Sequence, residues 1–115
     1  MTGEATWHSY DGGRSIGQQG SEKGIILRDE EHVEGARVTL ERDGYTPFAI
    51  TSGIYGWMVH TCFFSKEEEA QKMFEEMKLA LADILSLIPY ANDPELERKM
   101  HTATDAIRKF VDQFS

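Results

Sequence analysis

The hydrophobic period of this chain changes once, between Phe64 and Ser65, and that change constrains the fold more than any other feature. From Gly24 to Phe64 apolar residues alternate with polar ones, which is the period of a strand with one buried face. From Ser65 onward they recur every three or four residues, which is the period of an amphipathic helix. Strands that precede helices, rather than alternating with them, indicate an α+β fold.

Turn signals divide the alternating part into an antiparallel meander of four strands. Asp43-Gly44 and Ser52-Gly53 supply two of the tight turns, because such residues tolerate a positive φ angle. Pro47 cannot donate a hydrogen bond to a neighbouring strand, so it stands at the start of the third strand. The four predicted strands cover residues 24–29, 36–42, 48–51 and 53–64.

Two helices are predicted after the strands. Ser65 caps the first, because Ser65 and Glu68 have the spacing of a capping box, and Pro89 stops it. Asp93 caps the second helix, with Pro94 at its first position. The connection between the helices is short, so we expect an antiparallel helical hairpin packed on one face of the sheet.

The glycine-rich N-terminal segment, residues 1–23, is expected to be flexible, because each glycine loses much conformational entropy when it becomes ordered. Within this segment, residues 5–10 would add a short edge strand anchored by Trp7, which would make the sheet five-stranded. Residues 24–115 form a single α+β domain, and a chain of 115 residues is long enough to bury a core of its own.

Composition narrows the class of protein. The net charge of −8 repels phosphate backbones, so nucleic acid is not an expected partner, while a basic protein partner stays open. No apolar run reaches the roughly 20 residues that cross a bilayer, and the N-terminus lacks the regions of a secretory signal. The single cysteine cannot form an internal disulfide. We therefore expect an acidic, soluble, cytoplasmic protein that does not bind membranes.

The last strand is apolar on both of its faces. Alternation places Trp57, Val59, Thr61 and Phe63 on one face, and Met58, His60, Cys62 and Phe64 on the other. The helices cover one face of the sheet, and we expect the face with Met58 and Cys62 to be the open one. If that face stayed exposed to water, the fold would lose roughly 1.5–3 kcal/mol of burial free energy for each large apolar side chain. A second copy of the chain, the N-terminal segment with Trp7 folded back, or a ligand would cover it.

Residues of this strand form the candidate site. His60 and Cys62 share a strand face, but two ligands are too few for zinc unless His8, His32 or a carboxylate joins them. Their Cβ atoms stand about 6.5–7 Å apart, too far for a direct thiolate–imidazole hydrogen bond. We therefore predict no catalytic residue, metal site or cofactor. The candidate ligand- or partner-binding residues are Tyr55, Trp57, Met58, His60 and Cys62.

Acidic residues gather at residues 29–34 (DEEHVE), which we interpret as a charged, solvated hairpin loop because the calcium-loop spacing is absent. The sequence leaves two functions open. The first is a small binding or assembly module without chemistry of its own, homodimeric through the open sheet face. The second is a small enzyme or ligand carrier, whose pocket lies between the open face and the glycine-rich segment around His60. The specific role and the identity of any ligand or partner are not encoded in a recognisable motif.

Overall fold

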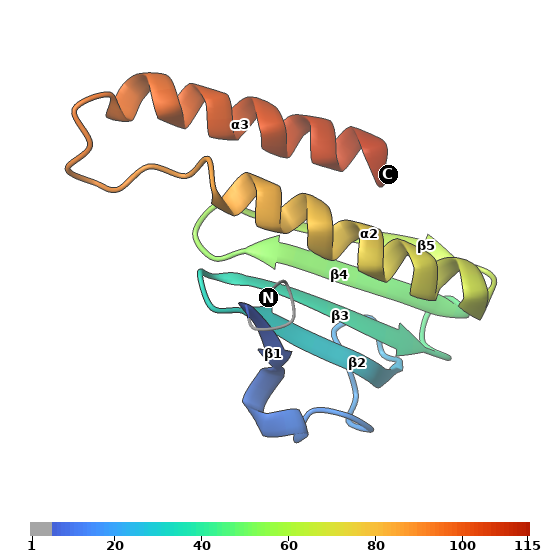
Figure 1. Cartoon of the computed structure of the whole chain (residues 1–115). Coiled ribbons are helices and arrows are strands. Elements are labelled where there is room, and N and C mark those ends of the chain that lie inside the picture. The colour runs from blue at the N-terminus through green and yellow to red at the C-terminus, as the bar shows by residue number, and fades with distance from the viewer. Residues whose placement is uncertain (1–5) are drawn as a thin grey trace.

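The computed structural model describes residues 6–115 and confirms the α+β fold (Figure 1). A five-stranded antiparallel sheet in the order β1-β2-β3-β4-β5 precedes two helices, so each strand pairs with its neighbour in the chain. The predicted meander and its additional edge strand are therefore both present. The strands are β1 (Trp7–Ser9), β2 (Ile25–His32), β3 (Ala36–Arg42), β4 (Phe48–Ile54) and β5 (Met58–Phe64).

The two helices, α2 (Glu67–Leu85) and α3 (Leu96–Gln113), lie on one side of the sheet, as Figure 1 shows. Between the helices and the sheet is one hydrophobic core, whose central members are fully buried. The predicted helix stripes supply the helical part of this core, except that Met100 of the second stripe is exposed. Its buried members from the helices and from the C-cap of α3 include Ala70, Phe74, Met77, Leu81, Ile84, Leu85, Phe110 and Phe114.

The helix starts differ from the predicted caps. Lys66 occupies the N-cap of α2 without a side-chain cap hydrogen bond, so the capping box expected at Ser65 is wrong. Three glutamates in the first turn stabilise the positive end of the helix dipole instead. The second helix begins at Leu96 rather than at Pro94, and Asp93 accepts a 2.8 Å hydrogen bond from the Glu95 amide in the turn before it.

The turn between β4 and β5 lies further along the chain than predicted. β4 continues to Ile54, so the reversal expected at Ser52-Gly53 is wrong. The chain turns instead through Tyr55–Trp57, where the Trp57 amide donates a 2.9 Å hydrogen bond to the Ile54 carbonyl. Gly56 has a φ angle of +82°, which glycine adopts without strain. This turn fixes the register of β5 against β4.

The register decides which face of β5 meets the helices. Cys62 lies opposite Ile50, and Met58 lies opposite Ile54, so these residues share the helix-covered face. The expectation that Met58, His60 and Cys62 lie on the open face is therefore wrong. Cys62 is buried in the core, and the His60 Nε2 lies 3.0 Å from the carbonyl oxygen of Phe114, the residue that follows α3. The open face of β5 carries the alternate set, which includes Val59, Thr61 and Phe63.

The acidic run at residues 29–34 also differs from expectation, because most of it is strand and not loop. β2 extends to His32, and the turn that follows is at residues 33–35. Two of its carboxylates have separate cationic partners, Asp29 with Arg37 and Glu30 with Arg28 and Lys78. Glu30 accepts hydrogen bonds from Arg28 Nη2 at 2.9 Å and Lys78 Nζ at 2.5 Å on the helix side of the sheet. Over residues 6–115, neither helix has the length and apolarity that crossing a bilayer requires.

Candidate functional site

The open face of the sheet has two halves that differ in what covers them. Residues 10–24 run across the half formed by β2 and β3, which we name the covered half. The Tyr10 ring stacks on the Arg37 guanidinium, with 3.5 Å from the ring centroid to Cζ. The Glu41 carboxylate accepts hydrogen bonds from the backbone amides of Gly24 at 2.9 Å and Glu22 at 3.1 Å. We name the half formed by β4 and β5 the uncovered half.

A buried ion pair lies within the covered half, between Asp29 of β2 and Arg37 of β3. The Asp29 side chain has no solvent exposure and accepts hydrogen bonds from Arg37 Nε at 2.9 Å and Arg37 Nη2 at 2.6 Å. Thr39 Oγ1 donates a third, longer hydrogen bond of 3.3 Å to the same carboxylate. The hydrogen bonds to Asp29 raise the pKa of the Arg37 guanidinium above its ordinary value. Arg37 is therefore a permanent cation held in one orientation.

One guanidinium nitrogen of Arg37 is left over in this arrangement. Nε and Nη2 both point at Asp29, whereas Nη1 makes no hydrogen bond to any described residue. The Arg37 side chain is 33% exposed to solvent, so solutes can reach it. A fixed donor of this kind recognises a carboxylate or carbonyl oxygen without having to be ordered first.

Arg37 lines a groove of about 760 Å³ in the open face. The groove lies between the glycine-rich segment at residues 19–21 and the turn that joins β4 to β5. Its sheet residues include Thr39, Thr51 and Gly53. Their side chains are small or absent, so they leave space for the groove above the sheet. Its other lining residues include Gln19, Ser21, Ile26, Tyr55, Trp57, Met58 and Val59.

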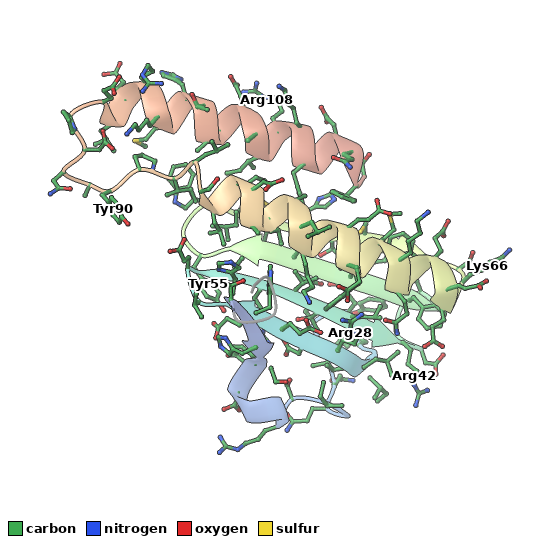
Figure 2. All side chains as sticks on the ribbon, in the orientation of Figure 1. Arg28, Arg42, Tyr55, Lys66, Tyr90 and Arg108 are labelled. Carbon is green, nitrogen blue, oxygen red and sulfur yellow. The ribbon has the colours of Figure 1, made fainter. Side chains whose placement is uncertain are left out.

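Hydroxyl and aromatic groups give the groove a mixed lining. The Ser21 and Thr51 hydroxyls lie 3.4 Å apart, which joins the segment to β4 across the groove. The Tyr55 hydroxyl donates a 2.6 Å hydrogen bond to the Glu31 carboxylate at the rim. Desolvation, together with this hydrogen bond, raises the pKa of Tyr55 to about 12, so the phenol stays protonated at neutral pH. Figure 2 shows Tyr55 at the end of the sheet, where the chain turns.

The structure divides the five candidate residues into two groups. Tyr55, Trp57 and Met58 are among the residues that line the groove at its turn end, although Trp57 and Met58 also pack against the core on the helix-covered side. His60 and Cys62 lie on the other side of the sheet, where His60 packs edge-on against Phe110 and Cys62 belongs to the core. Burial raises the pKa of the Cys62 thiol to about 11, so the reactive thiolate is scarce at neutral pH.

Arg37 and Asp29 were not among the residues predicted from the sequence to belong to the site. Their side chains meet because β2 contains a register shift between Ile26 and Arg28, which decides which residues of β2 share a face with Arg37. The alternation of Arg37 and Thr39 with apolar residues did place both on the open face. The acidic partner could not be chosen from that signal, because residues 29–31 are all acidic.

The histidines are separated by the fold. His8 Nε2 lies 3.2 Å from a Glu31 oxygen on the open face, whereas His32 accepts a 3.0 Å hydrogen bond from the Glu34 amide and stacks edge-on against Trp7. Burial lowers the pKa of His32, which keeps its ring neutral at neutral pH. Within residues 6–115, no three His, Cys, Asp or Glu side chains converge on a common metal position.

Comparison with protein-family models, with curated proteins and with solved structures found no match to this chain. The groove and its contacts are therefore the basis for a functional conclusion.

Proposed function

We propose that this protein is a binding module that holds a small organic molecule in the groove between residues 19–21 and the β4–β5 turn. The observation that carries the proposal is the fixed Arg37, whose Nη1 is without a partner among the described residues and which lines the groove. A well-formed pocket with a few converging polar groups is the usual form of a small-molecule site. Arg37 takes the place that the sequence analysis gave to His60.

Binding is favoured over catalysis by the side chains that face the ligand. Described residues that line the groove include no carboxylate, imidazole or thiol that could act as a general base. The Asp29 carboxylate behind Arg37 is fully buried and already accepts three hydrogen bonds. The groove therefore supplies orientation and shape rather than proton transfer.

The ligand class follows from charge and lining. Arg37 is the one formally charged residue among the described lining residues, and Asp29 already compensates much of its charge. A net charge of −8 on the chain disfavours ligands with several negative charges. Trp57 and Tyr55 offer flat apolar surface. A flat, largely apolar molecule with one carboxylate or amide carbonyl fits these conditions.

The test uses aromatic monocarboxylates, namely benzoate, phenylacetate and indole-3-acetate, with their amides and with matched aromatic amines. Backbone NMR spectra recorded up to 5 mM of each probe report which amides shift. We expect an acid or amide to shift the resonances of Thr51, Gly53 and Trp57, and the amines to shift none. A probe at ten times its Kd would stabilise the fold by about 1.4 kcal/mol through mass action.

Two variants locate the binding. Trp57→Ala should weaken binding of the best probe at least tenfold, because it removes a flat apolar wall. Tyr90→Ala is the control, because Tyr90 is 81% exposed on the connection between the helices, away from the groove (Figure 2). Equal affinity of Trp57→Ala and the wild type, or no shift near the groove with any probe, would overturn the proposal.

We also propose a cytoplasmic location. The observation in its favour is the single cysteine at position 62, because proteins of oxidising compartments commonly carry paired cysteines. Fractionation of cells that express the tagged chain tests it, and recovery from a secreted or membrane fraction would contradict it.

A further inference from the structure

We propose that two copies of this chain join edge to edge through β5, with their two sheets forming one continuous antiparallel sheet. The interface would be centred on Thr61, which lies in the middle of β5. This assembly rests on the outer edge of the sheet and does not require the proposed ligand, although Val59 belongs both to the groove lining and to the proposed interface.

The two edges of the sheet differ in their capacity to pair. β1, at one edge, has three residues, which is too short to template another strand. β5, at the other edge, has seven residues and pairs with β4 alone among the described strands. Its pairing with β4 runs without a register shift, and its sequence MVHTCFF contains no proline, lysine, arginine or acidic residue. Such devices normally protect an edge, and β5 carries none of these.

The direction of the backbone groups of β5 follows from two contacts. The Met58 carbonyl oxygen would lie 2.8 Å from a Cβ atom placed on Gly53, so this carbonyl points toward β4. The His60 carbonyl accepts a 3.4 Å hydrogen bond from Ser52 Oγ, again on the β4 side. Alternate residues of a strand point their backbone groups in opposite directions. Val59, Thr61 and Phe63 therefore present their amides and carbonyls to the outside.

A two-fold axis at Thr61 would satisfy these outward groups. Thr61 would then lie opposite Thr61 of the other copy, and Val59 would lie opposite Phe63 of the other copy. These two side chains are 79% and 52% exposed in the single chain, and both lie on the open face. Their pairing is of the aromatic and β-branched kind that stabilises cross-strand contacts.

The absence of fixed charges on β5 is compatible with pairing to a second copy. Each chain carries a net charge of −8, so two copies repel wherever acidic surfaces meet. β5 contains no lysine, arginine, aspartate or glutamate, so self-pairing there opposes no like charges. A basic or acidic peptide would find no complementary charge along the strand.

The test introduces cysteines at defined positions of the otherwise native chain. Thr61→Cys should form an intermolecular disulfide under mild oxidation, because facing residues of paired strands lie within the Cα separation that a disulfide spans. Leu79→Cys is the matched control, because Leu79 is 70% exposed but lies on α2. We expect cross-linking of Thr61→Cys at least tenfold faster than of Leu79→Cys. The native Cys62 is buried, so the wild type should cross-link no faster than the control.

The register has its own test. Val59→Cys alone should not cross-link, because its two copies would lie about 13 Å apart along the strands at about 3.3 Å per residue. The double variant Val59→Cys with Phe63→Cys should cross-link, because the cysteine at position 59 of one copy then lies opposite the cysteine at position 63 of the other copy. Circular dichroism of every variant confirms that it is folded.

Light scattering of the wild type at about 100 µM should give the mass of two chains, whereas Thr61→Pro, which removes one outward amide, should give the mass of one. A wild-type mass of one chain would overturn the proposal. Equal cross-linking rates of Thr61→Cys and Leu79→Cys in a dimeric wild type would also overturn it, because the copies would then meet elsewhere.

Discussion

The two halves of the open sheet face are built from opposite kinds of residue. The covered half contains the buried charged groups of Asp29 and Glu41, whereas the uncovered half exposes Val59 and Phe63. The glycine-rich segment thus lies over the polar half and leaves the apolar half open. Its backbone amides need acceptors, and the Glu41 carboxylate provides them. In this protein the position of the glycine-rich covering segment therefore follows the hydrogen-bond acceptors of the sheet rather than its apolar area.

The largest expected effect tests the ion pair beneath the covered half. Arg37→Met would leave the Asp29 carboxylate buried without its cation, and we expect a loss of about 3–5 kcal/mol in the free energy of unfolding. Urea denaturation measures this loss. Arg42→Met is the control, because Arg42 pairs with an exposed Asp43 and should change stability by less than about 1 kcal/mol. Equal effects of both variants would contradict the difference in burial.

The second prediction loosens the covering segment itself. Glu41→Ala removes an acceptor that is 1% exposed and leaves the amides of Glu22 and Gly24 without it. We expect a loss of about 1.5–3 kcal/mol, because hydrogen bonds to a charged acceptor are lost together. Hydrogen exchange at Gly24 should accelerate at least tenfold, whereas exchange in β4 should follow only the global stability. Unchanged exchange at Gly24 would show that Glu41 does not hold the segment.

The architecture was predictable from sequence because it depends on long, regular patterns. The change of period at Phe64 and the helix stripes survive errors of a few residues, so the class of fold and the position of the core follow. The prediction of which β5 side chains face the helices fails when the turn is misplaced by a few residues. Moving the turn from Ser52-Gly53 to Tyr55–Trp57 changes which residues of β5 oppose β4, and the sequence offers glycine at both places.

The groove could be predicted in part. Its place between the open face and the glycine-rich segment was expected, and Tyr55 and Trp57 were among its predicted residues. Its cationic group was not, because the partnership of Arg37 with Asp29 depends on the register shift in β2. A bulge of that kind is determined by the pairing between strands, and the local sequence does not predict it.

The third prediction tests the uncovered half with a small effect. Val59→Thr keeps the β-branched shape and replaces an apolar surface that is already 79% exposed. The free energy of unfolding should change by no more than about 0.5 kcal/mol, as for other surface substitutions. Urea denaturation at a concentration low enough for single chains gives this value. A loss of 2 kcal/mol or more would mean that Val59 is buried within one chain.

The last prediction concerns a pH dependence at the groove rim, which is absent at neutral pH. Tyr55 has a pKa raised from 10.0 to about 12 in the folded chain, so the folded state holds this proton more tightly than the unfolded state. Stability from this group is complete below pH 10 and declines as pH rises toward 12. Tyr55→Phe should remove this part of the decline, which denaturation between pH 9 and 11.5 measures. A slope identical to that of the wild type would indicate that Tyr55 titrates normally.

The neighbour-to-neighbour order of the strands has a consequence for synthesis on the ribosome. Each hairpin can close soon after its second strand emerges, because pairing never waits for a distant segment. The apolar face of the nascent sheet nevertheless stays exposed to solvent until both helices have been translated, because helix residues such as Phe74 and Phe110 bury it. During that interval the chain is most prone to aggregation and most dependent on chaperones.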